Sequence, residues 1–343
     1  AGNPAAGTPR VAALAIRGAD VSTLLKSEDK GGVYRTANGT AGDALAILHA
    51  AGMNYARLKV WVNPADGYNN KSRVVTMARR IKALGMGLLI DFHYSDRWAD
   101  PGQQNKPAAW ASHSFTQLTQ DVAAHTRDVL GALHAQGTPA DMVQIGNEIN
   151  GGILWPDGSS SNWANLAALL TSGANAAKAV NGSTKVVLHL AEGGDGAGAR
   201  WFFDNAVSHG VPFDVIGLSY YSYWHGSLND LRSTMNDVTA RYGKPVFVAE
   251  TAYPFTLAND DGLANIIGTA SQLTDGYPAT PTGQQANLRD VMSAVQAVPN
   301  GRGLGFFYWE PTWTAVQGNG WDPEDPNSGD AWENQALFDY DDR

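Results

Sequence analysis

Two glutamates, Glu148 and Glu250, each stand near the end of a short apolar run, 142–148 and 245–251. Such runs are typical of buried strands, so each carboxylate is expected where a strand leaves the core. Burial raises the pKa of a carboxyl group toward the range that a general acid needs. One such glutamate could simply cap a loop or pair with an arginine. Two facing carboxylates can cleave a glycosidic bond, because one protonates the leaving oxygen while the other attacks or activates water.

Further polar residues close or interrupt other apolar runs of the chain. They are Arg57 in 55–61, Asp91 and His93 in 87–93, Asn147 in 142–148, His189 in 185–191, Tyr220 and Tyr221 in 213–221, and Trp309 and Glu310 in 303–310. A buried polar group without a partner costs a few kcal/mol. One or two of these residues could be structural pairs, but polar residues on so many runs are expected of a shared site.

Seven predicted strands carry these residues. Together with an eighth predicted strand at 11–16, they alternate with predicted helices over 42–51, 71–84, 114–136, 163–180, 199–209, 228–242 and 284–298. This rhythm predicts an α/β fold, a single-domain (β/α)8 TIM barrel over residues 11–343 with long βα loops, after a flexible tail at 1–10. The carboxyl ends of the strands form the active face of such a barrel. An open doubly wound sheet is the alternative, but the glycine run 193–198 comes too late for its phosphate loop.

The composition excludes several classes of function. The chain has 343 residues and a formal net charge of -9 without a basic stripe, which argues against nucleic acid and anionic membranes as partners. No apolar run reaches the roughly 18 residues of a membrane span. The absence of cysteine excludes disulfides, thiolate metal sites and cysteine nucleophiles. The 11 tryptophans and 12 tyrosines fit a sugar-binding cleft, although most would fill core and rim positions in any large protein.

Other chemistries fit the sequence less well. A serine triad would need a G-x-S-x-G nucleophile elbow, and no strand end carries one. A metallohydrolase would need several histidines and aspartates at ligand spacing, and the DFH string at 91–93 is the nearest match. A barrel that binds carbohydrate without cleaving it is the alternative from another class. Such a protein would keep the aromatic residues but would not need both glutamates.

Five strings of the sequence point to a known family. YARLKVWVNPADG, LLIDFHYSDRWADP, VQIGNEINGGILWP, VFVAET and FFYWEP together resemble glycoside hydrolase family 53, the endo-β-1,4-galactanases, over about residues 17–313. The second and third strings carry most of the specificity. The resemblance implies a retaining endo-hydrolase of β-1,4-galactan, as found in type I arabinogalactan of pectin side chains. A β-mannanase or β-1,4-glucanase of the same clan is the enzymatic alternative.

The resemblance also implies roles for individual residues. Glu148 is expected to be the acid/base, Glu250 the nucleophile, and Arg57 the group that keeps the nucleophile ionised. Asn147 is expected to bond the sugar 2-OH, and Trp309 to floor the subsite of the scissile sugar. The other expected substrate contacts are Asp91, His93, Asp96, Trp98, His189, Tyr221 and Glu310, with Tyr220 as the alternative to Tyr221.

The chain departs from the family pattern in two places. Fungal members can carry disulfides, so the lack of cysteine implies a bacterial source. Some bacterial members bind calcium in the loop after the seventh strand. Here that loop offers the oxygen ligands Asn259, Asp261 and Asn265, but Leu263 stands where a histidine is expected. We therefore expect no required cofactor, and structural calcium only at these three residues.

The first ten residues, AGNPAAGTPR, resemble a tail left after processing. A removed signal peptide would explain such a start, so we expect a secreted protein. We also expect a monomer whose partner is the galactan polysaccharide.

Overall fold

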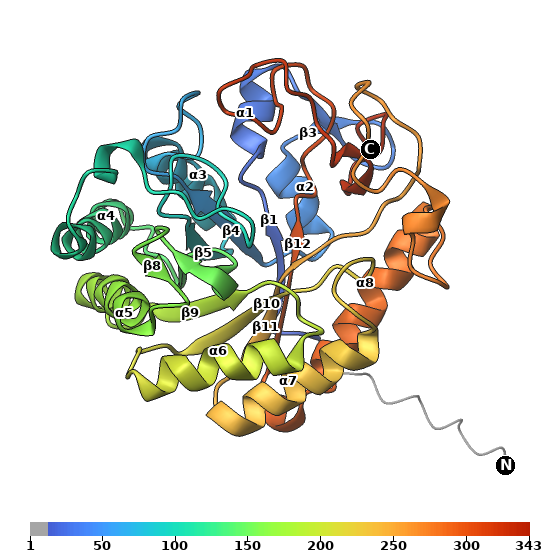
Figure 1. Ribbon diagram of the computed structural model, residues 1–343. Coiled ribbons are helices and arrows are strands. Elements are labelled where there is room, and N and C mark those ends of the chain that lie inside the picture. Colours follow the sequence, from blue (N-terminus) through green and yellow to red (C-terminus); the bar gives the residue numbers. More distant parts are fainter. Residues whose placement is uncertain (1–12) are drawn as a thin grey trace, which may run out of the picture.

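The computed structural model describes residues 13–343, and its centre is a closed barrel of eight parallel strands (Figure 1). The strands are β1 (Ile16–Asp20), β4 (Tyr55–Val60), β5 (Gly87–Phe92), β6 (Met142–Ile145), β9 (Lys185–Leu190), β10 (Val215–Ser219), β11 (Val246–Thr251) and β12 (Gly303–Trp309). Strand β1 pairs with both β4 and β12, which closes the ring. The predicted (β/α)8 barrel is confirmed, while the tail predicted at residues 1–10 lies outside the described residues.

Helices surround the strands on the outside of the barrel (Figure 1). They are α1 (Leu24–Asp29), α2 (Ala44–Ala50), α3 (Lys71–Ala83), α4 (Phe115–Ala135), α5 (Trp163–Val180), α6 (Gly196–Ser208), α7 (Leu228–Tyr242) and α8 (Pro281–Gln296). Several begin at a side chain that accepts from a free backbone N–H, as Asn70 does for Arg73 at the start of α3. Among helices of the described chain, none combines the length and apolar character needed to cross a bilayer.

Short elements decorate the loops of the barrel. Two small antiparallel sheets pair β2 (Tyr34–Arg35) with β3 (Ala41–Gly42) and β7 (Gly152–Ile153) with β8 (Gly158–Ser159). The 3-10 helices are η1 (Ala108–Trp110), η2 (Ile149–Gly151), η3 (Ala270–Gln272), η4 (Pro299–Gly301) and η5 (Glu333–Gln335). The sheet β7–β8 and η2 immediately follow the end of β6, where Glu148 lies.

The first strand does not lie where the sequence predicted it. We expected a strand over 11–16, but residues 13–15 have no regular structure and β1 begins at Ile16. The inward-facing residues of β1 are Ile16, Gly18 and Asp20. Only Ile16 is a large apolar residue, so the strand shows no hydrophobic periodicity. A Cβ on Gly18 would lie 2.4 Å from the Phe307 ring, which explains the glycine. The prediction was wrong because it followed hydrophobicity into the preceding segment, and it therefore missed Asp20.

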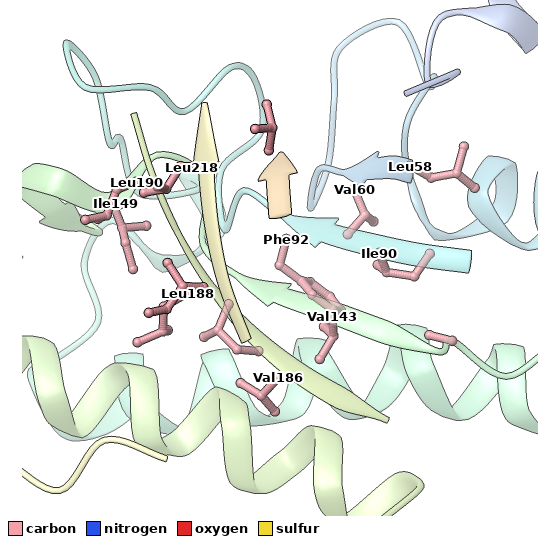
Figure 2. Packing of buried hydrophobic residues seen from close by; sticks show 14 of the residues in the cluster. Leu58, Val60, Ile90, Phe92, Val143, Ile149, Val186, Leu188, Leu190 and Leu218 are labelled. Carbon is pink, nitrogen blue, oxygen red and sulfur yellow. The ribbon is translucent and has the colours of Figure 1, made fainter. Parts of the chain in front are cut away.

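The outward-facing strand residues form the larger apolar layer, between the strands and the helices. Figure 2 shows part of this layer, with Leu58, Val60, Ile90, Phe92, Val143, Val186, Leu188, Leu190 and Leu218 packed together. Burying apolar side chains contributes roughly 25 cal/mol per Å². This layer fixes the strands, and it therefore fixes the direction of every inward-facing side chain.

A smaller apolar cluster fills the amino-terminal half of the barrel interior. Its buried members are Ile16, Leu89, Met142, Val187, Val215, Phe247, Ala249 and Phe307. Side chains along a strand return to the same face every second residue. The next inward residues are polar, as in the steps from Leu89 to Asp91, from Met142 to Gln144 and from Val187 to His189. The barrel therefore carries a polar layer above an apolar plug, at the carboxyl ends of its strands.

Candidate active site

Arg57 on β4 lies fully buried at the centre of the polar layer. Its Nη1 atom lies 3.0 Å from Asp20 Oδ2 and 2.9 Å from Glu250 Oε1, and its Nη2 atom lies 3.0 Å from Asp91 Oδ2. Burial alone would lower the pKa of Arg57, but the three carboxylates outweigh burial and raise it. The guanidinium therefore stays charged and gathers three acids around one point.

Two amides take the remaining donors of Arg57. Its Nε atom donates to Gln144 Oε1 at 2.8 Å, and Nη2 donates to Asn147 Oδ1 at 2.9 Å. All five N–H groups of the guanidinium then have a partner. Because arginine only donates, both amides must turn their oxygen toward it. Asn147 Nδ2 donates one hydrogen to the backbone oxygen of Ala99 at 2.8 Å, and the side chain lines the cleft above.

A β-bulge turns Glu250 toward this layer. The pairing of β10 with β11 moves from Leu218–Val248 to Ser219–Glu250, so β11 carries one extra residue, Ala249. The pairing of β11 with β12 shifts in the same segment. Under strict alternation Glu250 would face the helices, as Val248 does. The bulge therefore re-aims the carboxylate into the barrel, which is a common use of bulges next to active sites.

Both carboxylate oxygens of Glu250 are held. Oε1 contacts Arg57, and Oε2 accepts a hydrogen bond from the Tyr221 hydroxyl at 2.8 Å. Burial raises the pKa of Glu250, while Arg57 and the Tyr221 hydrogen bond oppose the rise. The hydroxyl of Tyr220 instead donates to the Gly226 backbone at 3.1 Å. Of the two tyrosines considered from the sequence, Tyr221 is the one that faces the carboxylates.

Glu148 leaves β6 in the left-handed backbone conformation, with a φ angle of 47°. One carboxylate oxygen of Glu148, one of Glu250 and a ring nitrogen of His189 all lie within 4.8 Å of one another. Burial raises the pKa of Glu148 well above its ordinary value, and the charge of Glu250 adds to the rise. The Glu148 carboxyl is therefore the more readily protonated member of the pair.

This triad could also be considered as a metal site. It is the only group of three His, Asp or Glu side chains in the described part of the chain whose ligating atoms come this close. However, both ring nitrogens of His189 already have protein partners, Gln144 on one side and Ser219 on the other. The ring is therefore not free to bind a cation.

Aromatic side chains line the cleft above the carboxylates. The Trp309 and Trp332 rings meet at 88° with centroids 4.9 Å apart, and Trp98 lies 5.9 Å from Trp309. The ammonium of Lys59 lies 4.0 Å from the Trp98 ring centre, a cation–π contact. Trp224 lines the same cleft and is 51% exposed, so its ring face remains available to a ligand. Flat apolar faces next to polar groups suit the faces of a sugar ring.

Most of the predicted site residues line this cleft. They are Asp91, His93, Trp98, Asn147, Glu148, Tyr221, Glu250 and Trp309. Arg57 and His189 lie beneath the lining, fully buried, and contact the lining residues from below. Asp96 lies apart from the lining, because its carboxylate accepts from the backbone N–H groups of Asn63 at 2.9 Å and Ala108 at 2.8 Å. Asp96 thus ties two loops together.

Glu310 is also buried beneath the cleft instead of lining it. Its Oε2 atom accepts from the Thr23 hydroxyl at 2.8 Å, and its Oε1 atom has no hydrogen-bond partner in the described chain. Burial raises the pKa of Glu310 well above its ordinary value; Asp20 adds to the rise, and Lys59 opposes it. Glu310 therefore lies beneath Asp20 and Lys59, two residues that line the cleft.

Several lining residues were not predicted from the sequence. They are Asp20, Lys59, Asp100, Glu192, Trp224, His225 and Trp332. Alternation could have found Lys59, which stands two residues after Arg57 on the same strand. Asp20 was not predicted because the first strand was placed at 11–16, which left Asp20 outside it. Trp332 lies in the segment after β12, and its Nε1–H donates to the Trp309 backbone at 3.1 Å. No local sequence pattern predicts the contact between Trp332 and Trp309.

The three calcium candidates lie in the loop after β11. Asn259 Oδ1 accepts from the Gly262 backbone at 2.6 Å, so this amide is already used. Asp261 Oδ2 accepts from the Asp330 backbone N–H at 2.5 Å, which joins this loop to the segment after β12. Asn265 Oδ1 is buried and has no hydrogen-bond partner within the described residues.

Two further acids lie at the same contact between loops. Asp330 Oδ2 and Glu333 Oε2 are buried and unpartnered among the described residues. Burial raises the pKa of Asp330 well above its ordinary value and that of Glu333 to about 7, and nearby Asp261 adds to both. Unpaired acceptors of this kind suit a hard cation such as Ca²⁺.

Comparison with known proteins gives one consistent result. The family model described as "Glycosyl hydrolase family 53" matches residues 16–343. A Niallia circulans protein described as "Uncharacterized protein in bgaB 5'region" is 43% identical, with 95% of this chain and 90% of that protein covered. The "Endo-beta-1,4-galactanase" of Bacillus subtilis is 36% identical, with 95% and 82% covered. The solved structure "Ignisphaera aggregans GH53 catalytic domain" has a TM-score of 0.92 at 42% identity, with 99% and 95% covered.

Proposed function

Because this chain belongs to glycosyl hydrolase family 53, we propose that it hydrolyses internal β-1,4-galactosidic bonds of galactan with net retention. The observation that carries this proposal is the Glu148–Glu250 pair, with carboxylate oxygens within 4.8 Å under an aromatic cleft. Retaining enzymes hold their carboxyl groups about 5–5.5 Å apart, whereas inverting enzymes leave roughly 6.5–9.5 Å for a water molecule. The short separation supports direct attack by a carboxylate.

The reaction proceeds in two displacements. In the first, an oxygen of Glu250 bonds to the anomeric carbon as the bond to the leaving sugar breaks, and Glu148 gives its proton to the leaving oxygen. In the second, Glu148 is a carboxylate and takes a proton from water. The water oxygen bonds to the anomeric carbon and displaces Glu250. Both glutamates return to their starting states.

The surroundings of the two acids match these different tasks. Glu250 must be ionised to attack, and Arg57 together with Tyr221 stabilises its negative charge. Glu148 must carry a proton, and burial next to Glu250 favours its neutral form. Two acids whose environments push their pKa values apart are the usual sign of an acid and a nucleophile.

Asn147 is proposed to bond the 2-OH of the sugar being transferred. Its amide oxygen is occupied by Arg57, and one of its two amide hydrogens is used by Ala99. The other hydrogen can serve a hydroxyl in the cleft. Trp309 supports the same subsite, because it lines the cleft beside the carboxylates. Hydrogen bonds to the 2-OH strengthen as the transition state forms.

The substrate assignment is tested by a reducing-sugar assay on galactan, mannan, xylan and β-glucan at equal mass concentration. We expect release from galactan to exceed release from every other polymer by at least about tenfold, because cleft shape, and not the carboxylate pair, selects the sugar. Faster release from mannan or β-glucan would point to a different specificity within the clan. Binding of galactan without any release would point to a non-catalytic barrel.

We also propose that Ca²⁺ binds between the loop after β11 and the segment after β12. Of the three residues expected from the sequence, Asp261 and Asn265 would hold it, and Asp330 and Glu333 would replace Asn259 because each has a buried oxygen without a hydrogen-bond partner among the described residues. The acids would have to draw together on binding, because Asp261, Asp330 and Glu333 do not form a group within 4.8 Å in the described chain. Removing bound metal with EDTA is then expected to lower Tm by several degrees, and added Ca²⁺ to restore it, because a ligand of the folded state stabilises it. Metal analysis after dialysis gives the independent readout.

The effect of Ca²⁺ should depend on pH in a defined direction. The pKa of Glu333 is raised to about 7 from an ordinary value of 4.5. Without Ca²⁺, the stability from this buried neutral acid is present below about 4.5 and is lost as pH rises through about 7. The Tm gain from Ca²⁺ is therefore expected to be larger at pH 8 than at pH 5, and smaller in Asp330→Asn. The calcium proposal would be contradicted by protein that holds no metal after dialysis and whose Tm changes neither with EDTA nor with added Ca²⁺ at both pH values.

We place the enzyme outside the cell, where a galactan polymer of pectin is accessible. An intact polysaccharide does not cross a membrane, so the polymer must be cleaved before its fragments are taken up. Comparing galactan hydrolysis in the culture medium and in the cell lysate of the source organism tests this placement, and activity confined to the lysate would contradict it.

We propose that the enzyme acts as a monomer, which size-exclusion chromatography with light scattering tests.

A further inference from the structure

A hydrogen-bond chain beneath Glu148 starts at a residue that can only donate. Arg57 Nε donates to Gln144 Oε1 at 2.8 Å, which fixes the orientation of that amide. Gln144 Nε2 therefore faces the other way, 3.0 Å from Asp91 Oδ1 and 2.9 Å from His189 Nδ1. Because an amide nitrogen cannot accept, His189 Nδ1 must be the acceptor.

A second donor confirms the state of the His189 ring. The backbone N–H of Glu148 also points at His189 Nδ1, at 3.2 Å. The ring is fully buried, and burial together with the charge of Arg57 holds the pKa of His189 well below its ordinary value. The ring is therefore neutral and carries its proton on Nε2. That nitrogen lies 2.7 Å from Ser219 Oγ, so His189 donates to Ser219.

Ser219 then has its own hydrogen left to donate. This residue ends β10 and is fully buried, and its hydroxyl faces the Glu148 carboxyl closely enough to act as a donor that lowers the pKa of Glu148. A hydroxyl that already accepts a hydrogen bond is polarised and becomes a better donor. Every link from Arg57 to the Glu148 carboxylate thus has one direction.

We propose that His189 and Ser219 are positioning residues that aim the carboxyl group of Glu148 and stabilise its ionised form after proton transfer. The proposal rests on the acid/base role proposed for Glu148. Neither residue lines the cleft, so both act through Glu148 and not on the sugar. A hydrogen bond to a charged acceptor is roughly twice as strong as one to a neutral acceptor. The Ser219 bond therefore strengthens as the proton leaves and loosens when the proton returns.

Other charged groups also face these residues. Glu250 and Asp100 raise the pKa of Glu148, and Arg57 lowers it. His93 and His225 face His189, and burial lowers the pKa of His225 to about 4, so that ring is neutral above this pH. All of these groups remain in place when only the Ser219 hydroxyl is removed. A change in the titration of Glu148 would then report the lost hydrogen bond.

The first test is Ser219→Ala, measured as the pH profile of kcat/KM on galactan. Loss of a donor to the carboxylate raises the pKa of Glu148, so the alkaline limb is expected to move up by about one pH unit. Turnover at the wild-type optimum should fall roughly three- to tenfold, less than the roughly 10²–10⁴-fold that a general acid–base group itself contributes, because Ser219 acts only through Glu148. A merely structural role would lower activity or Tm without moving the limb.

The second test separates the two ends of the His189 ring. In His189→Gln, the amide nitrogen can occupy the Nε2 position and still donate to Ser219. In His189→Asn, the amide can satisfy the Glu148 backbone N–H but leaves Ser219 without its donor. We expect His189→Asn to shift the alkaline limb in the same direction as Ser219→Ala, and His189→Gln to stay near wild type.

The double variant Ser219→Ala/His189→Asn decides whether the two residues act in series. We expect its pH profile to match that of Ser219→Ala alone, because the histidine acts through the serine. Ser222→Ala is the matched control, since its hydroxyl accepts from Thr274 and Asn287 and forms no hydrogen bond with Glu148 among the described residues. An unmoved limb in Ser219→Ala, or additive shifts in the double variant, would overturn the proposal. Failure of the proposed function would appear separately, as wild-type protein that does not hydrolyse galactan.

Discussion

Replacing Glu250 with Gln is expected to lower kcat on galactan by roughly 10⁴-fold or more, the scale seen when a nucleophile is removed from a catalytic unit. The amide keeps the shape of the side chain but has no charge with which to attack the anomeric carbon. It also leaves Arg57 with one carboxylate fewer. Initial rates of reducing-sugar release, with Tm as the folding check, measure this effect.

A trapping experiment gives the same prediction a positive readout. A 2-fluoro galactobioside with a good leaving group should add one glycosyl mass to the wild-type peptide that contains Glu250, because the fluorine slows the second displacement more than the first. Glu324→Gln is the matched control, since this side chain is 66% exposed and its carboxylate pairs, within the described part of the chain, only with Arg97. Turnover by Glu250→Gln within tenfold of wild type, or a label on another residue, would falsify the nucleophile assignment.

Replacing Glu148 with Ala should have an effect that depends on the leaving group. Hydrolysis of galactan is expected to fall by roughly 10²–10⁴-fold, because the leaving sugar then departs without a proton. A dinitrophenyl galactoside needs no proton, so its first displacement should continue and the glycosyl-enzyme should accumulate. Azide, which needs no base, is expected to restore turnover and to give the β-galactosyl azide. Product analysis by NMR reads the configuration.

The pH profile of this variant follows from the raised pKa of Glu148. Wild-type activity requires Glu148 protonated, so activity should be lost as pH rises through its folded pKa, which burial and Glu250 place well above the ordinary carboxyl value. On the dinitrophenyl substrate, Glu148→Ala should lack that alkaline limb. An α-azide product would mean inversion, and an alkaline limb that survives the substitution would show that another group titrates.

Much of the fold follows from local sequence because apolar periodicity is a local property. The limits of α5 and α7 match the predicted limits, and seven of the predicted strands overlap the observed ones extensively. The first strand failed because Ile16, Gly18 and Asp20 give its inward face no apolar rhythm. Phe307, the partner of Gly18 on the neighbouring strand β12, fills the space beside the glycine, and a residue so distant in sequence leaves no mark on the local pattern.

The sequence by itself also singled out Glu148 and Glu250 as the candidate catalytic pair, because each ends an apolar run and belongs to a family motif. It could not place Glu250 inside the barrel, since that depends on the extra residue at Ala249, a shift defined only by pairing with β10 and β12. The sequence could not predict which ring nitrogen of His189 carries the proton. That position is set by the orientation of the Gln144 amide, which is set in turn by Arg57. Residue types come from the chain, but hydrogen-bond direction and side-chain facing arise from neighbours that only the closed barrel brings together.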